Sequence, residues 1–123
     1  MKITKTQLKQ IVKEELILEQ SAQQILSLLS QMKMGLIKMI AKGLKNPVAT
    51  TKMVAYYATN PEALSALLEY MAKKLAREFP KPPDQKEIIQ YINKNTAALI
   101  KLGVQHYNSS TGADIKLKER ANI

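Results

Sequence analysis

The spacing of the apolar residues, which recur every three or four positions along most of the chain, limits the fold more than any other feature. This period places apolar side chains on one side of an α-helix, whereas a half-buried strand requires strict alternation. The apolar residues are mainly aliphatic and Met, with one Phe, five Tyr and no Trp, which suits packed helices better than a β-sandwich. A chain of 123 residues has the typical length of a single domain. We therefore predict an all-α protein, a small bundle of about five helices.

Start and stop signals divide the chain into these helices. The Asn-Pro pairs at 46–47 and 60–61 each combine an N-cap with a proline in the first turn, and Asp84 with Glu87 forms a capping-box pattern. Prolines at 80, 82 and 83 force an extended connection before that box. The predicted helices cover about residues 5–19, 22–44, 47–58, 61–79 and 84–103.

The chain is expected to have three parts. Residues 1–19 form an amphipathic leader helix, residues 20–103 form the helical domain, and residues 104–123 form a loop or loosely docked tail because they are polar and poorly periodic. Three apolar stripes are expected to make the core: Ile25, Leu29, Met32, Leu36 and Ile40; Leu64, Leu67, Leu68, Met71, Leu75 and Phe79; and Ile88, Ile89, Ile92, Thr96, Leu99 and Ile100.

Positive charge is concentrated in one segment without acidic residues. The formal net charge is +9, and no Asp or Glu lies between Glu19 and Glu62. The candidate contacts for nucleic-acid phosphates in this segment are Lys33, Lys38, Lys42, Lys45 and Lys52. Because Lys is a mobile point charge, we expect sequence-independent contact if nucleic acid is the partner. The alternative is a solvated surface that serves solubility.

The residue types that most reactions need are scarce. The chain has no Cys and a single His, His106, so it can build neither a thiolate nucleophile nor a His-based zinc site. Its four glycines are scattered and form neither a Walker loop nor a dinucleotide fingerprint. Tyr56 and Tyr57 follow Lys52 and raise the question of stacking on single-stranded bases. We predict that the protein is not an enzyme and holds no cofactor or metal.

The leader helix carries a narrow apolar stripe. Its members Leu8, Ile11, Val12 and Leu16 fall on one side of a helix that Thr4 or Thr6 could cap. A stripe of this kind with charged flanks suits a helix that lies in a partner's groove, so these four residues are the predicted docking contacts. We predict no transmembrane segment, because the most apolar stretch, residues 25–44, contains three lysines.

The first sixteen residues, MKITKTQLKQIVKEEL, resemble the leaders of small accessory and virion proteins of marine tailed phages. In large contractile-tailed phages such leaders can direct internal proteins into the prohead, where a maturation protease cuts after an aliphatic-x-Glu tripeptide. The resemblance therefore implies processing after Glu19, at Ile17-Leu18-Glu19. The tripeptides 67–69 and 117–119, Leu-Leu-Glu and Leu-Lys-Glu, fit the same rule.

These observations favour a non-enzymatic phage accessory or virion-associated protein with a basic surface, located in the virion or the host cytoplasm. Its partner would be a phage structural protein or nucleic-acid phosphates. One alternative is a sequence-independent nucleic-acid-binding protein that acts outside the virion. Another is a protein-binding regulator of a host factor that uses the leader helix or a groove lined by methionines. The oligomeric state is left open.

Overall fold

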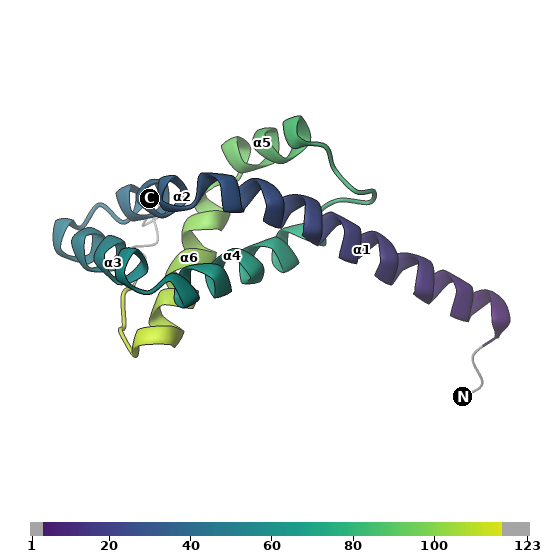
Figure 1. Cartoon of the computed structure of the whole chain (residues 1–123), viewed down its shortest axis with the longest axis horizontal. Helices are drawn as coiled ribbons and strands as arrows, with labels where there is room; N and C mark the ends of the chain where they lie inside the picture. The colour runs from purple at the N-terminus through teal and green to yellow at the C-terminus, as the bar shows by residue number, and fades with distance from the viewer. Residues whose placement is uncertain (1–3, 117–123) are drawn as a thin grey trace, which may run out of the picture.

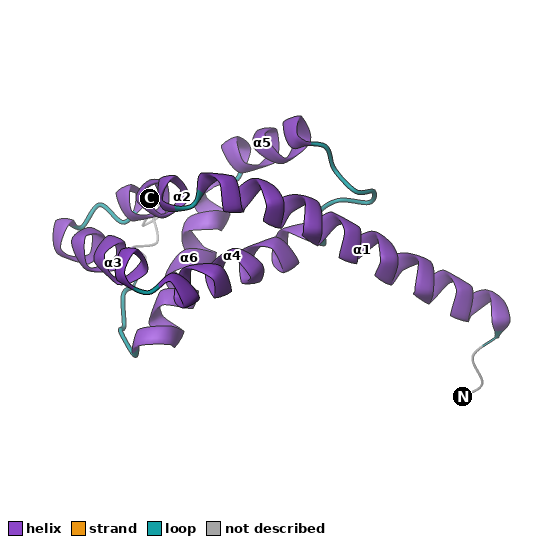
Figure 2. Cartoon of the chain, viewed as in Figure 1, coloured by secondary structure: helices purple, strands orange, loops and turns teal. Residues whose placement is uncertain are grey.

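The computed structural model describes residues 4–116 as six α-helices, with no strand in that range (Figures 1 and 2). The helices are α1 (Lys5–Met32), α2 (Met34–Gly43), α3 (Pro47–Thr59), α4 (Pro61–Ala76), α5 (Gln85–Lys94) and α6 (Thr96–Thr111). The all-α prediction is confirmed, with six helices in place of about five. Residues 1–3 of the leader and residues 117–123, which include the tripeptide 117–119, lie outside the described range.

Local capping explains most of the helix starts. The Thr4 hydroxyl accepts a hydrogen bond from the Gln7 amide at 3.1 Å, and the Gln7 side chain accepts one from the Thr4 amide at 3.0 Å. Asp84 caps α5 in the same way with Glu87, as predicted. Asn46 accepts from two amides at the start of α3. Asn60 differs, because its amide donates to the Tyr56 carbonyl and so closes α3 instead of capping α4.

The boundary predicted between the leader helix and the next helix is wrong. Helix α1 continues without a break from Lys5 to Met32. No Gly or Pro interrupts residues 20–32, so the hydrogen-bonded ladder propagates through them. The break comes instead at Lys33, which has φ 42° and joins α1 to α2. A single helix over 22–44 is therefore also incorrect.

The predicted last helix and tail are also corrected. Asn95 separates α5 from α6, and α6 continues past Gly103 to Thr111, where Gly112 closes it with φ 74°. Residues 104–116 are not a loose tail. Val104 and Tyr107 are buried, and the Asn108 side chain holds both backbone groups of Ile115, at 3.1 Å from its N–H and 3.0 Å from its carbonyl.

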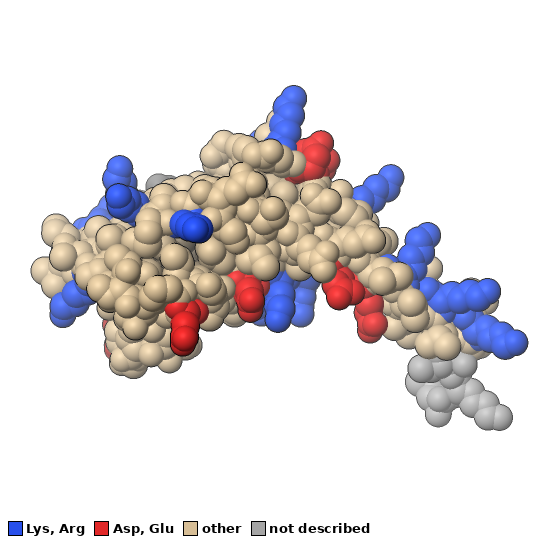
Figure 3. Space-filling view, in the orientation of Figure 1, with Lys and Arg blue, Asp and Glu red and all other residues tan. Residues whose placement is uncertain are grey.

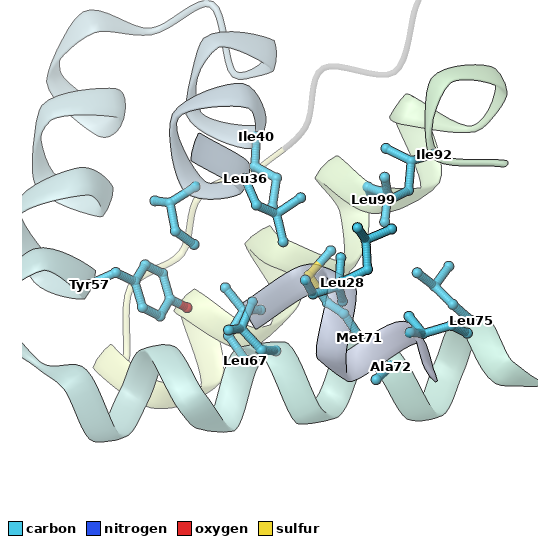
Figure 4. Packing of buried hydrophobic residues seen from close by; sticks show 14 of the residues in the cluster. Leu28, Leu36, Ile40, Tyr57, Leu67, Met71, Ala72, Leu75, Ile92 and Leu99 are labelled. Atoms are coloured by element: carbon cyan, nitrogen blue, oxygen red, sulfur yellow. The ribbon is translucent and has the colours of Figure 1, made fainter. Parts of the chain in front are cut away.

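The core lies where the C-terminal half of α1 runs along α4, with α2, α3 and α6 closing the other sides (Figures 1 and 4). Leu36, Leu67, Met71 and Leu99 are fully buried there, as the stripes predict. Ile89 is a correction, because it is 42 % exposed on the outer side of α5. Helix α4 also ends at Ala76 and not at Phe79.

Candidate functional site

The N-terminal half of α1 projects beyond the bundle (Figure 1). From residue 4 to residue 20 every side chain is exposed except the half-buried Ile17, and burial begins at Ser21. Five large apolar side chains stand in solvent on this half: Leu8 (54 % exposed), Ile11 (41 %), Val12 (47 %), Leu16 (51 %) and Leu18 (39 %). We call these five residues the α1 stripe. The structure adds Leu18 to the four residues predicted from the sequence.

The α1 stripe continues the buried face of the same helix. Ile11, Leu18 and Ile25 are each seven residues apart, so they share one side of α1, and only Ile25 is fully buried. Leu8, Val12 and Leu16 form a second row at a spacing of four, with a shallow groove between it and the lysines at 9 and 13. The projecting half thus presents a ridge and a groove, the features that helices use to pack on one another.

The helical conformation of the projecting half of α1 is stabilised by its own sequence and by the C-terminal half of α1, which packs in the bundle. The Thr4 capping box satisfies donors of its first turn, and the Gln10 side chain donates to Glu14 at 3.2 Å one turn later. Starting a helix is the costly step, whereas extending one that is already fixed by packing adds a hydrogen bond per residue. The packed C-terminal half of α1 already provides this helical start, so the α1 stripe lies on a preformed helix.

The five candidate lysines do not form one patch. All are exposed, but they are spread over the α1–α2 break, α2, the α2–α3 connection and α3. Lys38 and Lys42 are neighbours on one side of α2, whereas Lys33 and Lys45 flank opposite ends of that helix. On the face that Figure 3 shows, the cationic side chains around α2 and α3 do not form one continuous patch, and neutral surface lies between them. Of the five predicted phosphate contacts, Lys38 and Lys42 are thus the pair that lies one turn apart on the same helix.

Of the two tyrosines in the acid-free segment, Tyr57 is buried and Tyr56 is half-buried against the core. Tyr57 is 1 % exposed, and its ring meets that of Tyr56 edge-on with centroids 5.0 Å apart. Its hydroxyl lies 2.7 Å from Nδ1 of His106, which sits on α6 and not in a loop. Burial lowers the pKa of His106 and raises the pKa of Tyr57, so both are neutral at neutral pH. This pair joins α3 to α6 and is not available for stacking on bases.

The methionines of the predicted groove belong to the core or pack against it. Met53 and Met71 are buried, and Met32, Met34 and Met39 pack against the same cluster while partly exposed. The described part of the chain has no group of three His, Cys, Asp or Glu residues that could hold a metal ion.

Sequence reasoning missed a second groove, which lies between α4, α5 and α6. Tyr70 and Lys74 line it from α4, and Arg77 lines it from the C-cap of that helix. Tyr91 on α5 and Lys101 on α6 line the other side. The ammonium nitrogen of Lys74 lies 5.7 Å from the centre of the Tyr70 ring. Glu78 is the carboxylate of this groove. Tyr70, Lys74 and Arg77 are neighbours along α4 and its C-cap, whereas Tyr91 and Lys101 come from distant parts of the chain, so only the packing of the helices completes the groove.

Comparison with known proteins finds no match to this chain among protein-family models, curated proteins or solved structures. Among residues 4–116, none of the helices combines the length and the apolar character needed to cross a membrane.

Proposed function

We propose that the protein is a non-enzymatic docking protein. Its helical body begins at about residue 21, and the α1 stripe, which projects from this body, is its contact with another protein. The resemblance of residues 1–16 to phage leaders makes a phage accessory or virion-associated role the proposed setting, in the virion or the host cytoplasm.

One observation carries this proposal, namely five large apolar side chains exposed on a helix that is formed without a partner. Full burial of a Leu, Ile or Val supplies about 1.5 to 3 kcal/mol, and these side chains, which are 39 to 54 % exposed, forgo roughly half of it in water. Contiguous exposed apolar surface with charged residues beside it is typical of protein-binding sites. A preformed helix also loses little conformational entropy on binding, which favours recognition in a groove.

The position of Glu19 agrees with the processing that the leader resemblance implies. Glu19 is exposed, and burial starts two residues later at Ser21. Cleavage there would remove the whole α1 stripe and leave every buried residue of the core in place. Because Glu19 lies inside a continuous helix, a protease would have to open α1 locally before cutting. A native chain that begins at Gln20, detected by intact mass, would establish this processing.

A photo-cross-linking residue at Val12 in the full-length chain tests the docking proposal in the native host. The matched control carries the same group at Gln10, which is exposed on the opposite side of α1. We expect a discrete protein adduct from Val12 and none from Gln10. Equal labelling from both positions, or none from either, would contradict a docking role for the stripe.

The groove between α4, α5 and α6 favours a second candidate function, sequence-independent binding of single-stranded nucleic acid. Such binding requires cations interleaved with accessible aromatic rings, and the groove places the half-buried Tyr91 beside Lys74 and Lys101. Fluorescence anisotropy with a labelled oligonucleotide tests it. Lys74→Ala with Lys101→Ala should weaken binding and reduce its salt dependence, whereas Lys38→Ala with Lys42→Ala should have less effect.

A further inference from the structure

We propose that the occupant of the α1 stripe is the α1 stripe of a second copy of this chain, packed antiparallel about a two-fold axis that passes near Val12. This inference rests on the proposed docking function and names its partner. Two features support it, the symmetry of the apolar row and the order of the charges along the projecting helix.

The apolar row is symmetric about its centre. Leu8 and Leu16 are each four residues from Val12, so in an antiparallel pair centred on Val12 each Leu8 meets the partner's Leu16 at the same height. The two copies of Val12 then face each other across the axis. A two-fold contact needs such a self-complementary surface, because the same residues must serve on both sides.

The charges are also complementary under the same operation. Lysines come first along the projecting helix, and glutamates follow. The symmetry that pairs Leu8 with Leu16 brings Lys5 to the height of Glu19 and Lys9 to the height of Glu15, twice in each dimer. A parallel pair would instead place lysines beside lysines and glutamates beside glutamates, which disfavours that orientation.

The length of free helix also fits this arrangement. Residues 4–20 span about 24 Å at the rise of an α-helix. The antiparallel pair uses that whole length, because residue 4 of one copy lies opposite residue 20 of the other, where α1 becomes buried. Two helices of this size bury less than the roughly 1,200 Å² of a standard stable interface, so we expect a weak, concentration-dependent dimer.

Analytical ultracentrifugation of the full-length protein over a wide range of concentration tests the proposal. We expect the wild type to dimerise reversibly. Val12→Glu should abolish dimerisation, since it places two like charges at the axis, whereas Gln10→Glu on the opposite face should leave it unchanged. Circular dichroism of each variant checks that α1 remains helical.

Charge reversal then tests the orientation. Lys5→Glu with Lys9→Glu, and separately Glu15→Lys with Glu19→Lys, should each weaken self-association about tenfold or more, because every pair in the interface becomes repulsive. An equimolar mixture of the two variants should associate again, because each helix now complements the other.

A wild type that stays monomeric at every concentration would overturn the proposal, as would a dimer that these reversals leave intact or a mixture that fails to associate. The cross-linking experiment keeps the two proposals apart. A monomeric protein whose Val12 cross-links to a different protein refutes self-pairing and supports the docking function. A protein whose Val12 yields no adduct refutes both.

Discussion

Replacing Leu67 by Ala should reduce the free energy of unfolding by about 3 to 4 kcal/mol, within the range of about 2 to 5 that this change costs in protein cores. Leu67 lies on α4 with no exposed surface, in the cluster where α4 meets α1 (Figure 4). The substitution removes three buried carbon atoms, worth about 2.4 kcal/mol of transfer free energy at about 0.8 kcal/mol each. The cavity left behind supplies the rest, since packed helices relax only partly around it.

Leu16→Ala is the matched control, because it makes the same chemical change on a helix where the side chain is 51 % exposed. No cavity forms there, and Ala is the better helix former, so we expect a change below about 0.5 kcal/mol in the monomer. Urea unfolding followed by circular dichroism at low protein concentration measures both, with equal slopes expected for both variants. A cost below about 1 kcal/mol for Leu67→Ala, or similar costs for the two variants, would refute the assignment of core and free surface.

Three further predictions follow from other parts of the structure. The Ser21 hydroxyl is buried without a hydrogen-bond partner among residues 4–116, so Ser21→Ala should leave thermal stability unchanged or raise it, and a loss above about 1 kcal/mol would reveal a missing partner. A chain that lacks residues 1–19 should keep one cooperative unfolding transition, because the buried side chains begin at Ser21; loss of that transition would show that the projecting half supports the fold. Burial lowers the pKa of His106, so the unfolded chain binds this proton more readily. The contribution of His106 to the free energy of unfolding should be fully present above about pH 6.5 and should decrease as the pH falls below that value. His106→Gln should remove that part of the pH dependence measured by urea unfolding, and an unchanged profile would contradict the assignment.

The helix starts could be predicted because each depends on a few neighbouring residues. Asn46 and Asp84 cap the helices that follow them through bonds to amides two or three residues away. Asn60 occupies the same sequence pattern as Asn46 but turns back to the Tyr56 carbonyl. The pattern alone cannot separate these two uses, because an Asn amide can satisfy either end of a helix.

The two missed breaks differ in their local signals. Lys33 adopts a positive φ without being Gly or Asn, so no residue type marks that break. Asn95 interrupts a stretch that reads as one amphipathic helix, and its amide donates to the Tyr91 carbonyl four residues back, as Asn60 does at the end of α3. Both changes of direction serve the packing of the segments on either side, which bury Leu36 after the first and Leu99 after the second. The extension of α6 was missed for a related reason. Tyr107 packs against Tyr56, a contact between residues about fifty positions apart that no window of sequence contains.

The sequence by itself determined that the chain is helical, where most helices begin, and which side of each is apolar, because these properties depend on spacing and on caps within a few residues. The spacing alone does not separate a buried stripe from an exposed one, since Leu8 and Leu67 belong to patterns of the same kind. Only the tertiary structure decided that α4 covers the C-terminal half of α1 and leaves the N-terminal half free, because burial depends on which helix lies alongside, and that is a contact between distant parts of the chain.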